Sequence, residues 1–212
     1  MTSDPISTTR EDWLAAALQI LIEEGASAVK VLTLAQRLGG SRSSFYWFFK
    51  DRDALLAALL EYWSARNTKA ITDRASKPAA SVSQAVLHVF ECWADPALFD
   101  AKLDFAVREW ARRAPDIREA VHRADAERLS ALSAMFARFC SDPKEAIVRA
   151  RTLYFMQIGY YALDVQETNA QRGALLEHYV EVFSGERPSA PDLHWFMQII
   201  DKAHPEGATQ VG

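Results

Sequence analysis

The stretch GGSRSSFYWFFKDRDALL, residues 39–56, has five consecutive aromatic side chains between a serine cluster and a charged cluster. A helix buries only part of its circumference against a core, so five rings in a row must divide between two surroundings. Successive helical residues are about 100° apart, which places Phe45 and Phe49 nearly above one another and Phe48 about 60° to the side. These three rings therefore predict a core stripe.

The opposite face of this predicted helix carries the residues that suit contact with DNA. Tyr46 and Trp47 point away from the stripe, together with Arg42 and Ser43. Arg42 can bond guanine through two N–H groups, and Ser43 and Ser44 can bond base edges or phosphates. The indole of Trp47 can pack on thymine methyl groups or sugars, and the Tyr46 hydroxyl can reach a phosphate. This face predicts a major-groove contact.

The residues before this helix predict a helix-turn-helix unit. Two short helices are expected, over 32–38 and 42–49, with Ser41 as the N-cap of the second. Gly39 can take the left-handed conformation that a tight turn needs. Ala35, four residues before it, has a side chain small enough for the two helices to cross closely. A supporting helix starts at a Thr8–Glu11 capping box and ends at Gly25.

The net charge of the chain does not indicate DNA binding, but the charge of one short segment does. The chain has 212 residues and a net charge of −4, so the whole molecule does not have the basic character of many nucleic-acid-binding proteins. Residues 30–52, however, carry five basic side chains and a single acid. Lys50 and Arg52 in this strip can reach phosphates. A packed helical hairpin, with Tyr46 and Trp47 covered by a second domain, remains the alternative at this point.

The rest of the chain predicts more helices, so the fold class is all-α. Glycine and proline are scarce and fall between long periodic segments. Asp51 is the expected N-cap of a long helix, and a domain boundary inside that helix separates residues 1–66 from 67–212. Asp192 is expected to cap a short last helix, followed by a disordered tail over 204–212. The intervening helices are expected at 82–94, 97–113, 115–141, 143–167 and 171–184.

The sequence gives little support for a membrane protein, a secreted protein, a metal-binding protein or an enzyme. No apolar run approaches the length of a membrane span, and the N-terminus lacks the features of a secretory signal, so a cytoplasmic protein is expected. Cys92 and Cys140 match no metal or redox spacing. Glu119 and His122 form a single Glu-x-x-His, whereas di-iron bundles need two such motifs and two further glutamates. No cofactor and no catalytic residue are expected; a helical-bundle enzyme or metal-binding protein remains the alternative.

The second domain is rich in aromatic residues. Each ring alone is best explained as core, but together they can enclose an apolar cavity. Polar groups on the same segments can orient a ligand there. The residues expected at this cavity are Phe90, Trp93, Phe105, Trp110, Phe136, Tyr154, Gln157 and Tyr161.

The last two long helices have apolar faces wide enough for two partners. Such a helix buries one stripe inside its own subunit and another against a second subunit. The residues expected at the interface of a homodimer are Ala146, Ala150, Leu153, Leu175, Tyr179, Val182 and Phe183.

The N-terminal quarter of the chain, residues 10–56, resembles the DNA-binding domain of TetR family transcriptional regulators. The resemblance rests on AALQILIEEG, LAQRLGGS, SFYWFF and DRDALL. It implies a repressor that reads a palindromic double-stranded operator as a homodimer and releases it when a small hydrophobic or amphipathic effector binds the second domain. It also implies base or phosphate contacts for Arg42, Ser43, Ser44, Tyr46 and Trp47, and phosphate contacts for Thr33 and Arg52. This sequence departs from the family pattern at Gly40, where the turn residue is usually apolar, and at Phe48, where a histidine often contacts phosphate.

Overall fold

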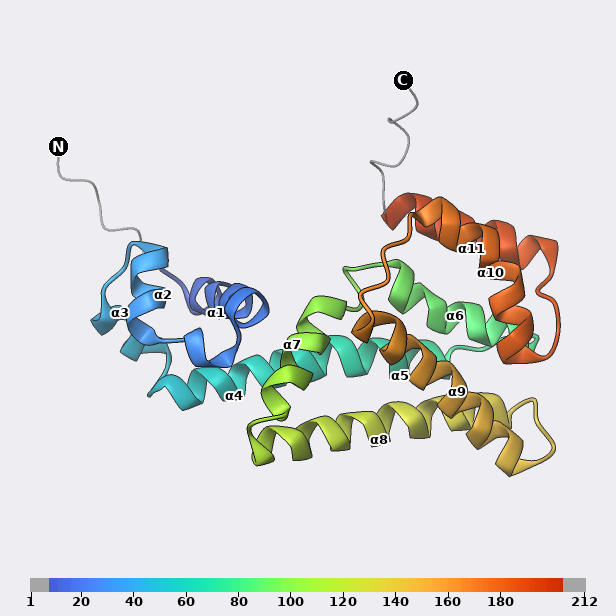
Figure 1. The fold of residues 1–212 in the computed structure, drawn as a ribbon, viewed down its shortest axis with the longest axis horizontal. Coiled ribbons are helices and arrows are strands. Elements are labelled where there is room, and N and C mark those ends of the chain that lie inside the picture. The colour runs from blue at the N-terminus through green and yellow to red at the C-terminus, as the bar shows by residue number, and fades with distance from the viewer. Residues whose placement is uncertain (1–7, 204–212) are drawn as a thin grey trace, which may run out of the picture. The chain divides into compact units, whose positions relative to one another are not determined.

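The computed structural model describes residues 8–203 and confirms the all-α fold (Figure 1). No strand occurs within this range. A 3-10 turn, Ala26–Ala28, follows the first helix, and a π-helical turn, Ser64–Thr68, joins α4 to α5. The predicted tail at 204–212 lies outside the described residues. The helices are α1 (Arg10–Glu24), α2 (Val31–Leu38), α3 (Arg42–Phe48), α4 (Arg52–Trp63), α5 (Lys69–Ser76), α6 (Val82–Ala94), α7 (Ala101–Ala111), α8 (Pro115–Ala137), α9 (Pro143–Ala162), α10 (Asn169–Ser184) and α11 (Ala190–Ala203).

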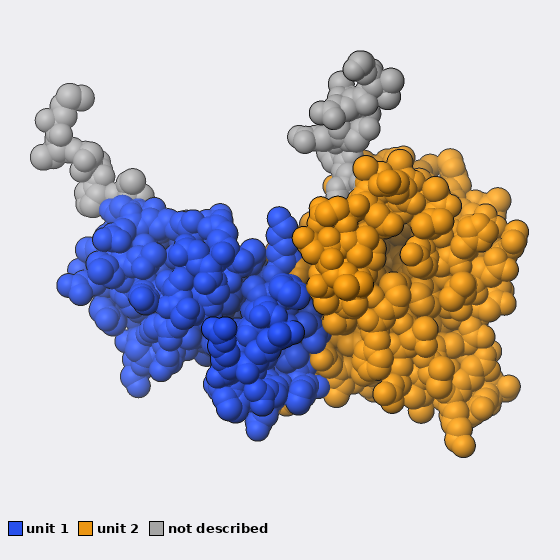
Figure 2. Space-filling model, viewed as in Figure 1, with its two compact units in different colours: residues 1–65, 102–122 blue, residues 66–101, 123–212 orange. Residues whose placement is uncertain are grey.

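The chain forms two compact units (Figure 2). The first contains residues up to 65 together with 102–122, and the second contains 66–101 together with the residues from 123 onward. The predicted division between residues 66 and 67 is close to the first of these breaks. Residues 102–122 belong to the first unit, where the indole N–H of Trp63 donates to the carboxylate of the buried Asp104 at 2.8 Å.

The core of the first unit is built around α1 and the aromatic stripe of α3. The ring of Phe45 meets Trp13 edge to face at 5.4 Å and stacks on Phe49 at 5.5 Å. Both Phe45 and Phe49 are buried, as predicted. Phe48 is 36% exposed, which corrects its predicted place in the core stripe. The reason is that α3 ends at Phe48, and Phe49 turns back to the core from an extended backbone conformation.

Several predicted helix ends differ from the structure: α7 spans 101–111 where 97–113 was predicted, α8 ends at 137 where 141 was predicted, and α10 starts at 169 where 171 was predicted. At three further ends a neighbouring polar residue makes the cap or the backbone leaves the helical range. The capping box of α1 is Thr9 with Asp12, one residue later than predicted. Helix α11 starts at Ala190 and not after Asp192, because the Ser189 hydroxyl accepts from the Asp192 N–H at 3.2 Å. Helix α9 stops at Ala162, and Asp164 has a φ of +49°, outside the helical range.

In the second unit α6 is the central helix, in contact with α5, α10 and α11. Ser81 caps its first turn, and its apolar face buries Val86, Leu87 and Val89. On another face, the buried carboxylate of Glu91 accepts hydrogen bonds from Lys77 at 2.8 Å and Arg74 at 3.3 Å, and His88 Nδ1 lies 2.9 Å away. These interactions connect α6 to α5 through Arg74 and to the residue after α5, Lys77.

A second buried polar cluster connects α8 with α9 inside the same unit. Arg128 is fully buried and donates to Thr68 Oγ1 and to the Tyr154 hydroxyl oxygen, both at 3.1 Å. The Tyr154 hydroxyl in turn donates to Asp125 Oδ1 at 2.6 Å. A buried cation needs such partners, because an unpaired charge in the core is strongly destabilising. Tyr154 is therefore a structural side chain.

Candidate functional site

The turn before α3 holds that helix by backbone hydrogen bonds. Gly39 is left-handed, with φ 63° and ψ 19°, as predicted. The N–H groups of Gly39 and Gly40 return to the carbonyls of Gln36 and Ala35 at 3.3 and 2.9 Å. Ser41 then caps α3 by accepting from the N–H of Ser44 at 3.1 Å. These hydrogen bonds hold the turn even though Gly40 stands where the TetR family usually has an apolar residue.

Two large side chains point outward from α3. Trp47 is 85% exposed and Tyr46 57% exposed, while Phe45 between the core helices is completely buried. Arg42 and Ser43 are exposed as well. A single exposed apolar side chain is common, but two large exposed rings next to one another form an apolar patch of the kind that marks an interaction site. The outward group predicted from the sequence is therefore gathered on the solvent face of one helix.

The serines of this helix are partly engaged in its own cap. The Ser44 hydroxyl donates to the Ser41 carbonyl at 2.7 Å, and the Ser41 and Ser43 hydroxyl oxygens are 2.8 Å apart. Ser43 is exposed and keeps hydrogen-bonding capacity, whereas Ser44 is only partly exposed. Of the two, Ser43 is the better placed for an external contact. Thr33, in the first turn of α2, is also partly exposed.

The basic strip predicted over residues 30–52 is smaller in the structure. Lys30, Arg42 and Lys50 are exposed and make no ion pair within residues 8–203. Arg37 is paired with Glu23, with its Nη2 2.7 Å from the carboxylate. Three cations thus remain around α2 and α3 for an anionic partner.

Arg52 has a structural role that the sequence did not indicate. Its Nε donates to the Val29 carbonyl and its Nη2 to the Ala26 carbonyl, both at 2.6 Å. These bonds tie the first turn of α4 to the 3-10 turn after α1. The Arg52 side chain is also 39% exposed and its Nη1 takes no part in these two bonds, so the contact with phosphate stays a prediction beside this structural role.

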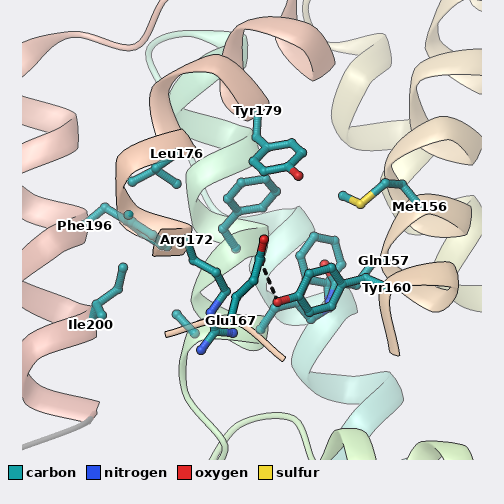
Figure 3. A pocket seen from close by; sticks show the side chains of 13 residues that line it. Met156, Gln157, Tyr160, Glu167, Arg172, Leu176, Tyr179, Phe196 and Ile200 are labelled. Atoms are coloured by element: carbon teal, nitrogen blue, oxygen red, sulfur yellow. Dashed lines mark hydrogen bonds between the residues drawn. The ribbon is translucent and has the colours of Figure 1, made fainter. Parts of the chain in front are cut away.

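The second unit contains a cavity of about 110 Å³ between α6, α9, α10 and α11. Figure 3 shows the side chains that line it. The walls are mostly aromatic and aliphatic, with Phe90, Trp93, Met156, Leu176, Phe196 and Ile200. The volume of this cavity is somewhat below that of an engineered cavity of about 150 Å³ that binds benzene, so it is on the scale of one small ring.

Three of the eight residues predicted at a cavity line this one: Phe90, Trp93 and Gln157. Phe136 and Tyr154 are buried in the core instead, and Tyr161 stacks on Phe99 at 5.9 Å. Phe105 and Trp110 belong to α7 in the first unit, so they correct the predicted set. Helical periodicity marks a ring as inward-facing, but it does not distinguish a core from a cavity wall.

Polar groups line one side of the cavity, and sequence reasoning found only Gln157 among them. Figure 3 shows Tyr160 beside Gln157 on α9, with its hydroxyl joined to Glu167. That hydroxyl donates to Glu167 Oε2 at 3.0 Å. Burial, and then this bond to a carboxylate, raise the pKa of Tyr160, so its hydroxyl stays protonated. Tyr160 was detectable, because a residue three positions after Gln157 lies on the same helical face.

The residues predicted at a subunit interface fall into a buried group and an exposed group. Ala146, Ala150, Leu153 and Phe183 are buried inside the unit, which corrects their assignment to an interface. Leu175, Tyr179 and Val182 are exposed at positions i, i+4 and i+7 of α10, so they form one stripe. A matching stripe on α9 has exposed Val148, Thr152 and Phe155 at the same spacing. Val148, Thr152 and Val182 line one shallow surface hollow, so the two stripes are neighbours.

Other sites are not supported in residues 8–203. His122 of the Glu-x-x-His is exposed. No group of three or more histidine, cysteine, aspartate or glutamate side chains is arranged to hold a metal ion in this range. None of the helices described is both long and apolar enough to cross a membrane.

Comparison with known proteins agrees with the geometry of the first unit. A sequence model described as "Bacterial regulatory proteins, tetR family" matches residues 14–59. The class A tetracycline repressor protein from transposon 1721 of Escherichia coli is 42% identical over 52 residues, which cover 24% of this chain and 24% of that protein. The match therefore spans only about a quarter of that repressor.

Solved structures share the fold over most of the chain. AmtR from Mycobacterium smegmatis aligns with a TM-score of 0.61 and 17% identity, covering 95% of this chain and 97% of AmtR. The TetR family regulator PfmR from Thermus thermophilus aligns with a TM-score of 0.63 and 16% identity, covering 87% of this chain and 100% of PfmR. The segment matched by the family model holds the turn, the buried Phe45 and the outward residues of α3. Residues 14–59 therefore have the sequence pattern of the tetR family of bacterial regulatory proteins, and most of the chain shares the fold of solved TetR family regulators.

Proposed function

We propose that this protein is a homodimeric transcriptional repressor that reads a palindromic operator and releases it when a small molecule binds the second unit. The observation that carries the proposal is the division of the α3 rings. Phe45 is buried against Trp13, while Tyr46 and Trp47 are exposed beside Arg42. Such a regulator works where its operator is, in the cytoplasm.

DNA reading is assigned to the outward face of α3. A helix that is seven residues long fits the major groove, and Arg42 at its N-terminal end is suited to the O6 and N7 acceptors of guanine. Ser43 and Tyr46 supply hydroxyls, and the Trp47 indole can pack on a thymine methyl group. Lys30 and Lys50 supply charge for the phosphates on either side.

Dimerisation is assigned to the apolar stripes of α9 and α10. Two neighbouring helices from each subunit would close a four-helix bundle, with Val148, Phe155 and Val182 losing most of their exposed surface. A two-fold axis through that bundle relates two α3 helices. Half-sites about 34 Å apart would then lie in successive major grooves.

The effector site is assigned to the cavity between α6 and α10. Four polar residues line a mostly apolar space, as in most sites for small ligands: Gln157, Tyr160, Glu167 and Arg172. Helix α6 carries Phe90 and Trp93 in the cavity wall and Glu91 in the cluster with α5. A ligand that moves α6 would therefore disturb its fastening to α5.

The proposal is tested on duplexes selected from a random pool by the full-length protein. Arg42→Ala and Trp47→Ala should each weaken binding of the selected duplex by at least about tenfold, as loss of a good base contact does. Because both side chains are exposed, the melting temperature should change little. Lys50→Ala should weaken binding to all duplexes alike and reduce the salt slope by about 1.

Leu163→Ala is the matched control, since Leu163 is 77% exposed and lies far along the chain between α9 and α10. It should leave both DNA affinity and melting temperature unchanged. Full affinity of the Arg42→Ala and Trp47→Ala double variant would remove α3 from the DNA interface. Binding by a monomer with the affinity of the dimer would remove the palindrome from the proposal.

A further inference from the structure

We propose that the cavity of the second unit takes an uncharged single-ring compound whose polar head both donates and accepts hydrogen bonds, such as a carboxamide. The inference rests on the proposed effector function and deepens it by giving the chemical class of the ligand. It is carried by three observations: the size of the cavity, the balance of charge in its wall, and the unused hydrogen-bonding capacity of Gln157.

The size restricts the ligand to about one ring. The cavity volume of about 110 Å³ is somewhat below that of the engineered site of about 150 Å³ that binds benzene. Phe90, Trp93 and Phe196 supply aromatic walls that can stack on a ring or meet its edge. Only about one ring fits inside these walls, and a fused-ring compound or a long acyl chain would extend out of the open side of the pocket.

The charge of the wall favours a neutral ligand. The cavity has one acidic side chain, Glu167, and one basic side chain, Arg172, so its formal charge is balanced. Glu167 already accepts the hydrogen bond of Tyr160. An ion brought into this mostly apolar space would lose its hydration and meet a wall without net opposite charge, which is unfavourable.

Gln157 is the polar side chain of the cavity wall that can bind a ligand. It is only 9% exposed, lines the cavity, and its side-chain amide forms no hydrogen bond within residues 8–203. The amide N and O of Gln157 are not among the fully enclosed side-chain atoms without a partner, so they face the cavity space, where a ligand with a donor and an acceptor could replace water. The Tyr160 hydroxyl, one turn along α9, donates to Glu167 and still has acceptor capacity on its oxygen. A carboxamide head matches this pair, because it offers an N–H donor and a carbonyl acceptor together.

The test uses three compounds of nearly equal shape and different charge: benzamide, benzoate and benzamidine. Each is titrated calorimetrically into the full-length protein at pH 7. Benzamide should bind at least about tenfold more tightly than either ion, because burying an unmatched charge is costly. Naphthalene-2-carboxamide, with the same head and a second ring, should bind more weakly than benzamide. Equal or tighter binding of benzoate, benzamidine or the naphthalene compound would overturn the proposed class.

Two variants locate the site. Gln157→Leu keeps the side-chain volume and removes the amide, so benzamide affinity should fall by roughly tenfold. Gln198→Leu makes the same change at an exposed position of α11 and should have no effect. Ile200→Trp fills the cavity and should abolish binding of all probes. Unchanged benzamide affinity in Gln157→Leu, or retained binding in Ile200→Trp, would place the site elsewhere and overturn the inference.

A parallel DNA titration separates this inference from the function on which it rests. If benzamide binds with the stated preferences and lowers operator affinity, both stand. If it binds with those preferences and operator affinity is unchanged, the ligand class stands and effector-driven release is wrong. If operator is bound but benzamide does not bind up to millimolar concentration, DNA reading stands and the ligand class is wrong.

Discussion

The buried carboxylate of Glu91 gives the stability prediction with the largest expected effect. Three basic side chains lie within hydrogen-bond distance of it: Arg74, Lys77 and His88. The Glu91 side chain is 6% exposed and lies 2.8 Å from Lys77 Nζ and 3.3 Å from Arg74 Nε. Glu91→Gln keeps the shape and one acceptor oxygen, but it removes the charge that these cations face. Hydrogen bonds to charged groups contribute about 1.5–3 kcal/mol, so we expect the free energy of unfolding to fall by about 2–3 kcal/mol.

Thermal unfolding followed by calorimetry is the assay. A loss of 1 kcal/mol lowers the melting temperature by about 2–4 °C in a chain of this size, so the expected decrease is roughly 4–12 °C at pH 7. Glu145→Gln is the matched control, because its carboxylate is 2.8 Å from Arg149 but 45% exposed. Exposed pairs contribute less than about 1 kcal/mol, so this control should shift the melting temperature by less than about 4 °C.

The pH dependence of the same difference tests the electrostatic cause. Burial raises the pKa of Glu91, but the hydrogen bonds from His88 and Lys77 and the charges of Lys77 and Arg74 outweigh it, so the pKa is lowered. A carboxyl with a lowered folded pKa contributes stability above its unfolded pKa, and this contribution is lost as pH falls through the folded pKa. The difference between wild type and Glu91→Gln should be constant above about pH 5 and shrink below about pH 4. A difference under about 1 °C at pH 7, or one that does not change with pH, would refute the reasoning.

Three further predictions concern the turn, the thiols and the dimer. Gly39→Ala should lower the free energy of unfolding by about 1–2 kcal/mol, because the φ of Gly39 is +63°. Gly40→Ala should lower it by less than about 0.5 kcal/mol, because the nearest atom to the added Cβ would be 3.5 Å away. Equal effects of the two substitutions in urea unfolding would contradict this. Burial raises the pKa of Cys92 to about 12, so iodoacetamide at pH 8 should alkylate the partly exposed Cys140 before Cys92. Peptide mass spectrometry that finds Cys92 alkylated first would contradict this. Val182→Glu places a charge on the apolar stripe of α10, where the side chain is 73% exposed, and should convert dimer to monomer in light scattering; an unchanged dimer mass would move the interface elsewhere.

The sequence predicted well where a local rule decides the outcome. Gly39 is left-handed because the turn demands it, and Ser41 and Asp51 cap α3 and α4 as their spacing indicated. The burial of Phe45 opposite the exposed Trp47 follows from helical geometry alone. These rules act within a few residues, so no knowledge of tertiary packing was needed.

The cavity and the apolar stripes depend on tertiary packing, and prediction was correspondingly weaker there. Phe136 and Phe90 are both inward-facing rings, yet only Phe90 borders empty space. Ala150 and Val148 lie on the same helix, and only the arrangement of the neighbouring helices determines that Ala150 is core and Val148 exposed. The structural role of Arg52 was not predicted for the same reason, since its acceptors are carbonyls 23 and 26 residues earlier in the chain.

Methylation interference on a selected operator tests the central claim most directly. Methylation at guanine N7 modifies the major groove, and methylation at adenine N3 modifies the minor groove. The account predicts that interference by N7 methylation falls in two clusters about 10 base pairs apart, and that Arg42→Ala removes one guanine from each cluster. Interference confined to adenine N3, or a single cluster bound by one subunit, would contradict a pair of α3 helices in successive major grooves.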